Sequence, residues 1–186
     1  MAKAGRLAAG VRRPGRAVIV TDSNVDLLYS DKLAASLREA GFDAVKFVFP
    51  AGEKSKNAST LLSLLNFMAE SRLTRIDTVF ALGGGVVGDL AGLAASLYMR
   101  GVGLVQLPTT LLAAVDSSVG GKTAVDLPAG KNLMGAFYQP DLVICDTDTL
   151  GTLPEAEFSN ACAEVIKYGF IRDAAILTML GNRPVD

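Results

Sequence analysis

The segment CAEVIKYGF, residues 162–170, places an acid and a base in an otherwise apolar stretch. Glu164 and Lys167 are three residues apart, so a helix would bring both onto one face. One interpretation is a solvent-exposed ion pair worth roughly 0.2–0.5 kcal/mol. The other is a buried acid and base, or a metal ligand with an auxiliary lysine. A catalytic metal site usually includes histidine beside the carboxylate, and the chain contains no histidine, so both interpretations remain open.

A glycine-rich segment, ALGGGVVGDLAG, joins an apolar run to a helical pattern. Gly83, Gly84 and Gly85 would let the backbone approach a phosphate closely, at a helix N-terminus that offers unpaired N–H groups. The spacing is not the G-x-G-x-x-G fingerprint of dinucleotide-binding proteins, so a tight strand-to-helix turn is the alternative. Asp89, one turn into the helix, is either an ordinary cap or a ligand of a ribose or nicotinamide group.

Polar clusters also follow three other apolar runs of the sequence. Each cluster alone is typical of a turn or a helix cap. Ligands of open parallel sheets bind outside the carboxyl ends of the strands, so clusters at successive strand ends predict one ligand-binding rim. The residues are Asp22 and Asn24 after the first run, Glu53 and Lys56 after the second, and Thr109, Thr110, Asp116, Ser117 and Lys122 after the fourth.

The elements that must position these residues alternate between short β-branched runs and longer helical patterns. We predict strands at residues 17–21, 44–49, 77–83, 103–108 and 141–146. Helices are predicted at about residues 26–40 and 57–71, and from the glycine-rich segment to about residue 99. Continuous apolar strands alternating with helices predict an α/β fold, with a parallel sheet covered by helices on both faces.

The pattern changes after residue 152, where two helical stretches follow each other. The first begins near Pro154 and the second covers about residues 174–180. We interpret an α/β unit that becomes helical and then stops as incomplete. We therefore expect one domain at residues 1–152, lacking its N-terminal strands, and the incomplete start of a helical domain at residues 153–186.

Composition limits the classes of function. Residues 1–16 carry five basic and no acidic residues, which leaves 13 basic and 19 acidic residues for the rest. No basic stripe continues into the folded part, which argues against a nucleic-acid partner, and we expect a frayed N-terminal helix rather than a signal peptide. No apolar run is long enough to span a bilayer. The two cysteines, Cys145 and Cys162, are predicted to be buried thiols in a reducing cytoplasm.

Four segments of the sequence closely resemble the 3-dehydroquinate synthase family: ALGGGVVGDLAG, LPTTLLAAVDSSVGGKTAVD, GKNLMGAFYQP and AEVIKYG. The resemblance extends from Ala17 to Leu180 and is most specific at residues 116–123 and 130–140. It implies a Rossmann-like NAD domain followed by a helical metal- and substrate-binding domain. In this family, 3-deoxy-D-arabino-heptulosonate 7-phosphate is converted to 3-dehydroquinate and phosphate in the shikimate pathway, with NAD⁺ and zinc or cobalt. NAD⁺ is reduced and regenerated within one turnover.

The resemblance also implies roles for individual residues. Glu164 matches one of three metal ligands, and the other two are histidines that this chain lacks. Arg100 matches an arginine that reaches a substrate phosphate across a homodimer interface. The remaining substrate-binding matches are Asp116, Lys122, Lys131, Asn132 and Lys167. The NAD-binding matches are Asp22, Asn24, Glu53, Lys56, Gly84, Gly85, Asp89, Thr109, Thr110, Asp116, Ser117, Lys122, Lys131, Thr152, Leu153 and Glu157.

Three alternatives stand beside this prediction. Another sugar-phosphate cyclase and an NAD-dependent polyol dehydrogenase are both disfavoured by the segment DSSVGGKT. The third is a non-catalytic NAD-binding fragment, which the absence of histidine favours for the chain as it stands. The expected location is the cytoplasm.

Overall fold

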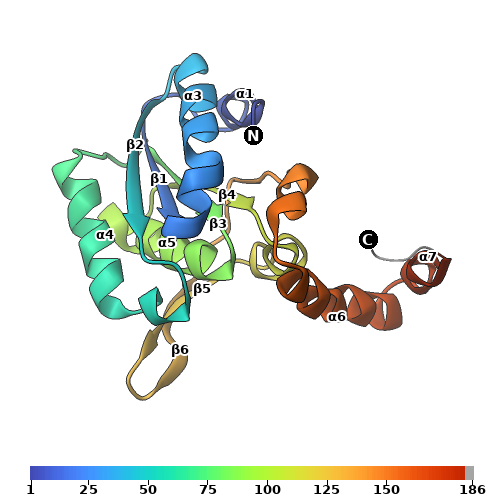
Figure 1. Cartoon of the computed structure of the whole chain (residues 1–186). Coiled ribbons are helices and arrows are strands. Elements are labelled where there is room, and N and C mark those ends of the chain that lie inside the picture. The colour runs from blue at the N-terminus through green and yellow to red at the C-terminus, as the bar shows by residue number, and fades with distance from the viewer. Residues whose placement is uncertain (183–186) are drawn as a thin grey trace.

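The computed structural model describes residues 1–182, and Figure 1 shows their arrangement. Five parallel strands form one sheet in the order β2-β1-β3-β4-β7. This confirms the predicted parallel α/β sheet. The strands are β1 (Arg16–Asp22), β2 (Asp43–Phe49), β3 (Thr78–Gly83), β4 (Gly103–Pro108) and β7 (Leu142–Val143).

Helices cover both faces of the sheet because alternate residues of the central strands point to opposite sides. Ile19 and Phe80 pack with α1 (Ala4–Ala9) and α3 (Asp31–Glu39). Val20 and Ala81 pack on the opposite face with α4 (Ala58–Glu70) and α5 (Gly85–Leu97). All residues of β3 and β4 are buried, which explains why these strands appear in the sequence as continuous apolar runs.

The helices begin and end close to the predicted positions, for identifiable reasons. The Asn57 side chain caps α4 by accepting a hydrogen bond from the Thr60 backbone N–H at 2.9 Å. The chain leaves α3 through Gly41, whose φ of 89° suits glycine. Asp22 caps α2 (Ser23–Val25), which continues through a π-helical turn, η1 (Asp26–Ser30), into α3.

The fifth strand is shorter than predicted. Residues 141–146 were expected to form it, but only Leu142 and Val143 pair with β4. The Asp141 carboxylate accepts a hydrogen bond from the Leu104 N–H at 3.0 Å, so a side chain replaces one backbone contact. Asp146 instead caps the following 3₁₀ helix, η5 (Thr147–Thr152).

An antiparallel hairpin that the sequence analysis did not predict follows the fourth strand. It consists of β5 (Lys122–Leu127) and β6 (Gly130–Phe137), and in Figure 1 it extends away from the sheet. Its base is packed against α5, where a Cβ added at Gly92 would lie 2.4 Å from Thr123 Cγ2. Val125 is fully buried in the same core cluster.

The two ends of the described chain differ from expectation in opposite ways. The predicted N-terminal helix is packed rather than frayed, because Ala4 and Ala8 of α1 are buried against α3. At the other end, α6 (Glu155–Ile171) and α7 (Ala175–Asn182) confirm the predicted helices and extend away from the sheet (Figure 1).

The cysteine and membrane predictions have separate outcomes. Cys145 is exposed and Cys162 half-buried, so the prediction of buried thiols was wrong; both are free. Within residues 1–182, the structure has no helix with the length and apolar character that a membrane crossing needs.

Candidate functional site

The connections of β1 and β3 place a crevice at one edge of the sheet. From β1 the chain crosses to β2, and it then returns to β3 on the other side of β1. Such a switch point is where open parallel sheets bind ligands. A cavity of about 790 Å³ lies there, lined by fifteen of the predicted residues: Asp22, Asn24, Glu53, Lys56, Gly84, Gly85, Asp89, Thr109, Thr110, Asp116, Ser117, Asn132, Thr152, Leu153 and Glu157.

The glycine-rich segment forms the floor of this cavity. Gly84 is the N-terminal cap residue of α5 and offers no side chain to its N–H groups. A Cβ at Gly84 would approach Thr110 Cγ2 to 3.2 Å, and one at Gly85 would approach Ser117 Oγ to 3.2 Å. Glycine therefore brings this segment close to the β4 connection, while the first N–H groups of α5 remain available for an anion.

Two buried hydroxyl groups beside the glycines lack a hydrogen-bond partner among the described residues. They are Thr109 Oγ1 and Ser117 Oγ, and both residues line the cavity. Buried polar atoms in folded proteins nearly always have a partner. These hydroxyls, the glycines and the α5 N-terminus therefore fit a bound polar ligand such as a dinucleotide.

An ion pair between Lys56 and Asp89 lies at the wall of this larger cavity. The Lys56 ammonium lies 2.5 Å from Asp89 Oδ2 and donates a hydrogen bond to Asn132 Oδ1 at 2.6 Å. Burial raises the pKa of the Asp89 carboxyl, and the neighbouring Lys56 partly offsets that rise. Asp89 is thus the ion-pair partner of Lys56, which differs from the helix-cap alternative of the sequence analysis.

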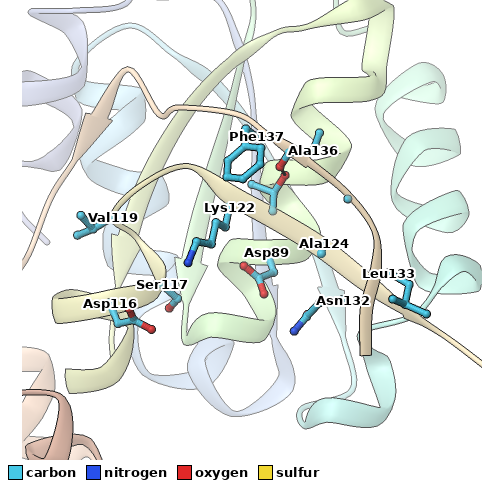
Figure 2. A pocket seen from close by; sticks show the side chains of 12 residues that line it. Asp89, Asp116, Ser117, Val119, Lys122, Ala124, Asn132, Leu133, Ala136 and Phe137 are labelled. Atoms are coloured by element: carbon cyan, nitrogen blue, oxygen red, sulfur yellow. Dashed lines mark hydrogen bonds between the residues drawn. The ribbon is translucent and has the colours of Figure 1, made fainter. Parts of the chain in front are cut away.

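A second cavity of about 490 Å³ lies between α5, the β4 connection and the hairpin. Figure 2 shows Asp89, Asp116, Ser117 and Lys122 grouped around it. The outer wall is apolar and includes Val119, Leu133 and Phe137 of the hairpin region. Four residues line both cavities: Asp89, Asp116, Ser117 and Asn132. The two spaces therefore share a wall.

Four predicted residues line neither cavity. Lys131 is exposed and forms an ion pair with Glu53 at 3.2 Å, at the rim of the larger cavity. Arg100 follows the C-terminal end of α5, at the other end of this helix from the glycine-rich segment. The structure does not bring Arg100 to the site.

The remaining two, Glu164 and Lys167, form an ion pair with each other on α6. The Glu164 carboxylate raises the pKa of Lys167, whose side chain is exposed. Within residues 1–182, no group of three or more histidine, cysteine, aspartate or glutamate side chains is arranged to hold a metal ion. The described residues therefore do not form a metal site around Glu164.

The larger cavity also has an apolar wall, which was not predicted from the sequence. Val25, Leu28 and Tyr29 lie there, with Leu112 from the β4 connection. The first three have i, i+3, i+4 spacing directly after the polar cluster at the end of β1, a signal that could have found them. Tyr29 Oη lies 2.5 Å from Thr152 Oγ1, which ties η1 to η5.

The fold and the site together define a doubly wound α/β protein with a glycine-lined ligand site at its switch point. A comparison with family models gives the particular family. The model for the N-terminal part of 3-dehydroquinate synthase matches residues 46–160, and the chain belongs to this family.

Curated relatives agree with this membership. The chain is 55% identical over 162 residues to 3-dehydroquinate synthase of Symbiobacterium thermophilum, covering 87% of this chain and 45% of the relative. It is 51% identical over 181 residues to that of Rhizobium etli, covering 97% of this chain and 48% of the relative. The chain thus spans about half the length of the curated relatives that it matches.

Solved structures extend the comparison. A 2-epi-5-epi-valiolone synthase from Streptomyces hygroscopicus with NAD⁺ and Zn²⁺ bound superposes with a TM-score of 0.85 and 34% identity, over 94% of this chain and 48% of that one. A 2-deoxy-scyllo-inosose synthase complexed with carbaglucose-6-phosphate, NAD⁺ and Co²⁺ gives 0.78 and 33%, over 82% and 42%. Glycerol dehydrogenase of Schizosaccharomyces pombe, with 0.71 and 21% over 91% and 41%, shares the fold.

Proposed function

We propose that this chain forms the NAD-binding part of a 3-dehydroquinate synthase, which converts 3-deoxy-D-arabino-heptulosonate 7-phosphate to 3-dehydroquinate and phosphate. The observation that carries the proposal is the larger cavity. It combines Gly84 and Gly85 at the α5 N-terminus with the hydroxyls of Thr109 and Ser117, which lack a hydrogen-bond partner within residues 1–182. This donor set suits a pyrophosphate and its attached riboses.

Each part of the larger cavity has a role in this proposal. The N–H groups at the start of α5 hold the pyrophosphate, and the carboxylates of Asp22 and Glu53 accept hydrogen bonds from ribose hydroxyls. The apolar wall at Val25 and Leu28 contacts the adenine ring. Bound NAD⁺ would supply reversible hydride transfer.

The smaller cavity is the proposed substrate site. Lys122 projects into it from β5, and Asn132 reaches it from β6. An anionic sugar phosphate needs fixed cations and hydrogen-bond donors, which these two side chains supply. Asp116 lines both cavities and can orient a substrate hydroxyl toward the nicotinamide. In the proposed homodimer, Arg100 contacts the substrate of the other subunit.

The described residues do not fit a metal ion. Zn²⁺ and Co²⁺ accompany the two sugar-phosphate cyclases compared above. Within residues 1–182 of this chain, no group of potential ligands is arranged to hold a metal ion, and Glu164 is already paired with Lys167. No step of the reaction is assigned through a metal on this chain. The same observation favours a second candidate function, in which this chain binds NAD⁺ and is catalytically inactive alone.

Identity values favour 3-dehydroquinate synthase over the other enzyme classes. Relatives with that name reach 51–55%, against 33–34% for the other two cyclases. A phosphate-release assay with 3-deoxy-D-arabino-heptulosonate 7-phosphate, NAD⁺ and Zn²⁺ separates an active chain from an inactive NAD-binding one. We expect no phosphate release from this chain alone; release would instead locate a complete site on it.

Two adjacent serines offer a matched test of the cofactor site. Ser117 Oγ and Ser118 Oγ are both buried without a partner among the described residues, but only Ser117 lines the larger cavity. By calorimetry, we expect Ser117→Ala to weaken NAD⁺ binding about threefold to tenfold, the value of one hydrogen bond. Ser118→Ala should leave the affinity unchanged. Absence of NAD⁺ binding to the wild-type chain, or equal losses in both variants, would contradict the proposal.

A further inference from the structure

Three segments distant in the sequence meet at the Lys56 side chain. Lys56 lies between η2 (Glu53–Ser55) and α4, Asp89 belongs to α5, and Asn132 belongs to β6. The Lys56 side chain is only 7% exposed, and its ammonium contacts both partners, at 2.5 Å and 2.6 Å. A buried lysine that keeps its charge needs such partners.

The tip of the hairpin, residues 126–133, depends on this contact more than the base does. The base is held by packing of Thr123 and Val125 against α5. Beyond Val125 the strand register shifts, and the Asp126 N–H lies at this irregularity. That N–H donates a hydrogen bond to the Lys56 carbonyl oxygen at 2.9 Å. A register shift of this kind re-aims the backbone.

The tip also has a hydrogen bond of its own, which is independent of Lys56. The Asn132 N–H donates to Asp126 Oδ1 at 2.7 Å. Asn132 adopts a φ of 57°, which asparagine tolerates better than most residues. The Asp126 amide thus reports docking of the tip on Lys56, whereas the Asn132 amide reports only that the tip itself is intact.

The two partners of Lys56 occupy the wall shared by the two cavities. Asp89 and Asn132 line both spaces. A second link between the tip and η2, the ion pair of Lys131 with Glu53, has side chains 73% and 48% exposed. Exposed pairs of this kind contribute little and are screened by salt. Of these two links, the buried contact at Lys56 therefore contributes more to holding the hairpin tip in place.

We propose that Lys56 is a positioning residue that latches the hairpin tip to the wall between the cavities, so that a ligand in the larger cavity also fixes the geometry of the smaller one. The identities of the two ligands rest on the proposed function. The latch itself rests on the contacts of Lys56 and can be tested without any ligand.

The ligand-free test is amide hydrogen exchange of the whole chain. In Lys56→Met, which keeps the length of the side chain and removes the charge, we expect exchange at the Asp126 amide to accelerate at least about tenfold. Exchange at the Asn132 amide should not change. Lys54→Met, at an exposed residue of the same segment, is the matched control and should leave both amides unaffected. Lys56→Arg should restore much of the Asp126 protection.

A second variant covers the case in which Lys56→Met unfolds. Asn132→Gly removes the carboxamide partner of Lys56 while glycine accepts the φ of 57° without strain. It should accelerate Asp126 exchange in the same way. Unchanged Asp126 exchange in the folded variants would overturn the latch.

The ligand test uses NAD⁺ as the probe. In the wild-type chain, saturating NAD⁺ should slow Asp126 exchange; in Lys56→Met, at NAD⁺ concentrations raised to saturation, the slowing should be absent. Equal slowing in both proteins would overturn the coupling. If calorimetry detects no NAD⁺ binding to the wild-type chain, the proposed function fails, and the ligand-free test still decides the latch.

Discussion

The central sheet and the two C-terminal helices place functional residues in different ways. In the sheet, β3 and β4 are buried along their whole length, and the cavity residues Gly84, Gly85, Thr109 and Thr110 follow directly after these two strands. In α6, by contrast, Ala161 and Gly169 are the buried residues, and Phe170, Ile171 and Met179 of α6–α7 are largely exposed.

This difference explains why one set of predicted residues forms a site and the other does not. The strand ends converge on one edge because parallel strands share a direction, so side chains far apart in sequence meet at the switch point. Glu164 and Lys167 both belong to α6, and they form an ion pair with each other. A helix fixes the spacing along its own face but not what faces it.

The largest expected effect on stability is at Phe80, compared with the same substitution at Phe170. Phe80 of β3 is fully buried and packs edge-to-face against Phe42, whereas Phe170 of α6 is 76% exposed. Phe80→Ala should lower the free energy of unfolding by about 3–5 kcal/mol, because it removes a core side chain and leaves a cavity. Phe170→Ala should change it by less than about 0.5 kcal/mol. Urea unfolding followed by circular dichroism measures both; similar losses would break the contrast.

A smaller effect on stability is expected from substituting alanine for two helical glycines. A Cβ at Gly92 of α5 would lie 2.4 Å from Thr123 Cγ2, whereas no atom of the described residues lies within 4 Å of a Cβ at Gly181 of α7. Gly92→Ala should destabilise the protein by about 1–3 kcal/mol, because overpacking outweighs the higher helix propensity of alanine. Gly181→Ala should be neutral or stabilising by up to about 1 kcal/mol. Thermal unfolding of both variants checks the signs, and a stabilising Gly92→Ala would contradict the packing argument.

The smallest effect is expected at the Glu164–Lys167 pair. Glu164 raises the pKa of Lys167 above its ordinary 10.5, so the folded state holds this proton more tightly than the unfolded state does. The contribution is complete below about pH 10.5 and disappears as the pH rises through the folded-state value. Because Lys167 is exposed, Lys167→Met should leave the urea midpoint at pH 7 unchanged within error. A clear shift at pH 7 that persists in 1 M salt would indicate a buried role for this pair.

The ends of the strands were predictable because they depend on local sequence patterns, namely apolar runs followed by polar residues. Continuous apolar runs located β1, β3 and β4, and the segments that follow these runs supplied nine of the residues that line the larger cavity. Four others, Asn132, Thr152, Leu153 and Glu157, were expected only from the family resemblance. The hairpin was not predicted, since its β6 strand is largely exposed and lacks a strong period-2 pattern. The length of β7 also escaped prediction, because the Asp141 side chain contacts β4 at the start of the strand and Asp146 caps η5 after it.

The sequence by itself determined the alternation of strands and helices, the glycine-rich turn and the residue types of the rim, because these depend on local periodicity and backbone freedom. Only the tertiary structure decided which of those residues meet. Lys56, Asp89 and Asn132 lie in three separate segments of the chain, and their contact depends on strand order and on the docking of the hairpin. Glu164 and Lys167 show the opposite case, in which correct local structure leaves two reactive groups facing each other and solvent, because no other described element supplies ligands for a metal.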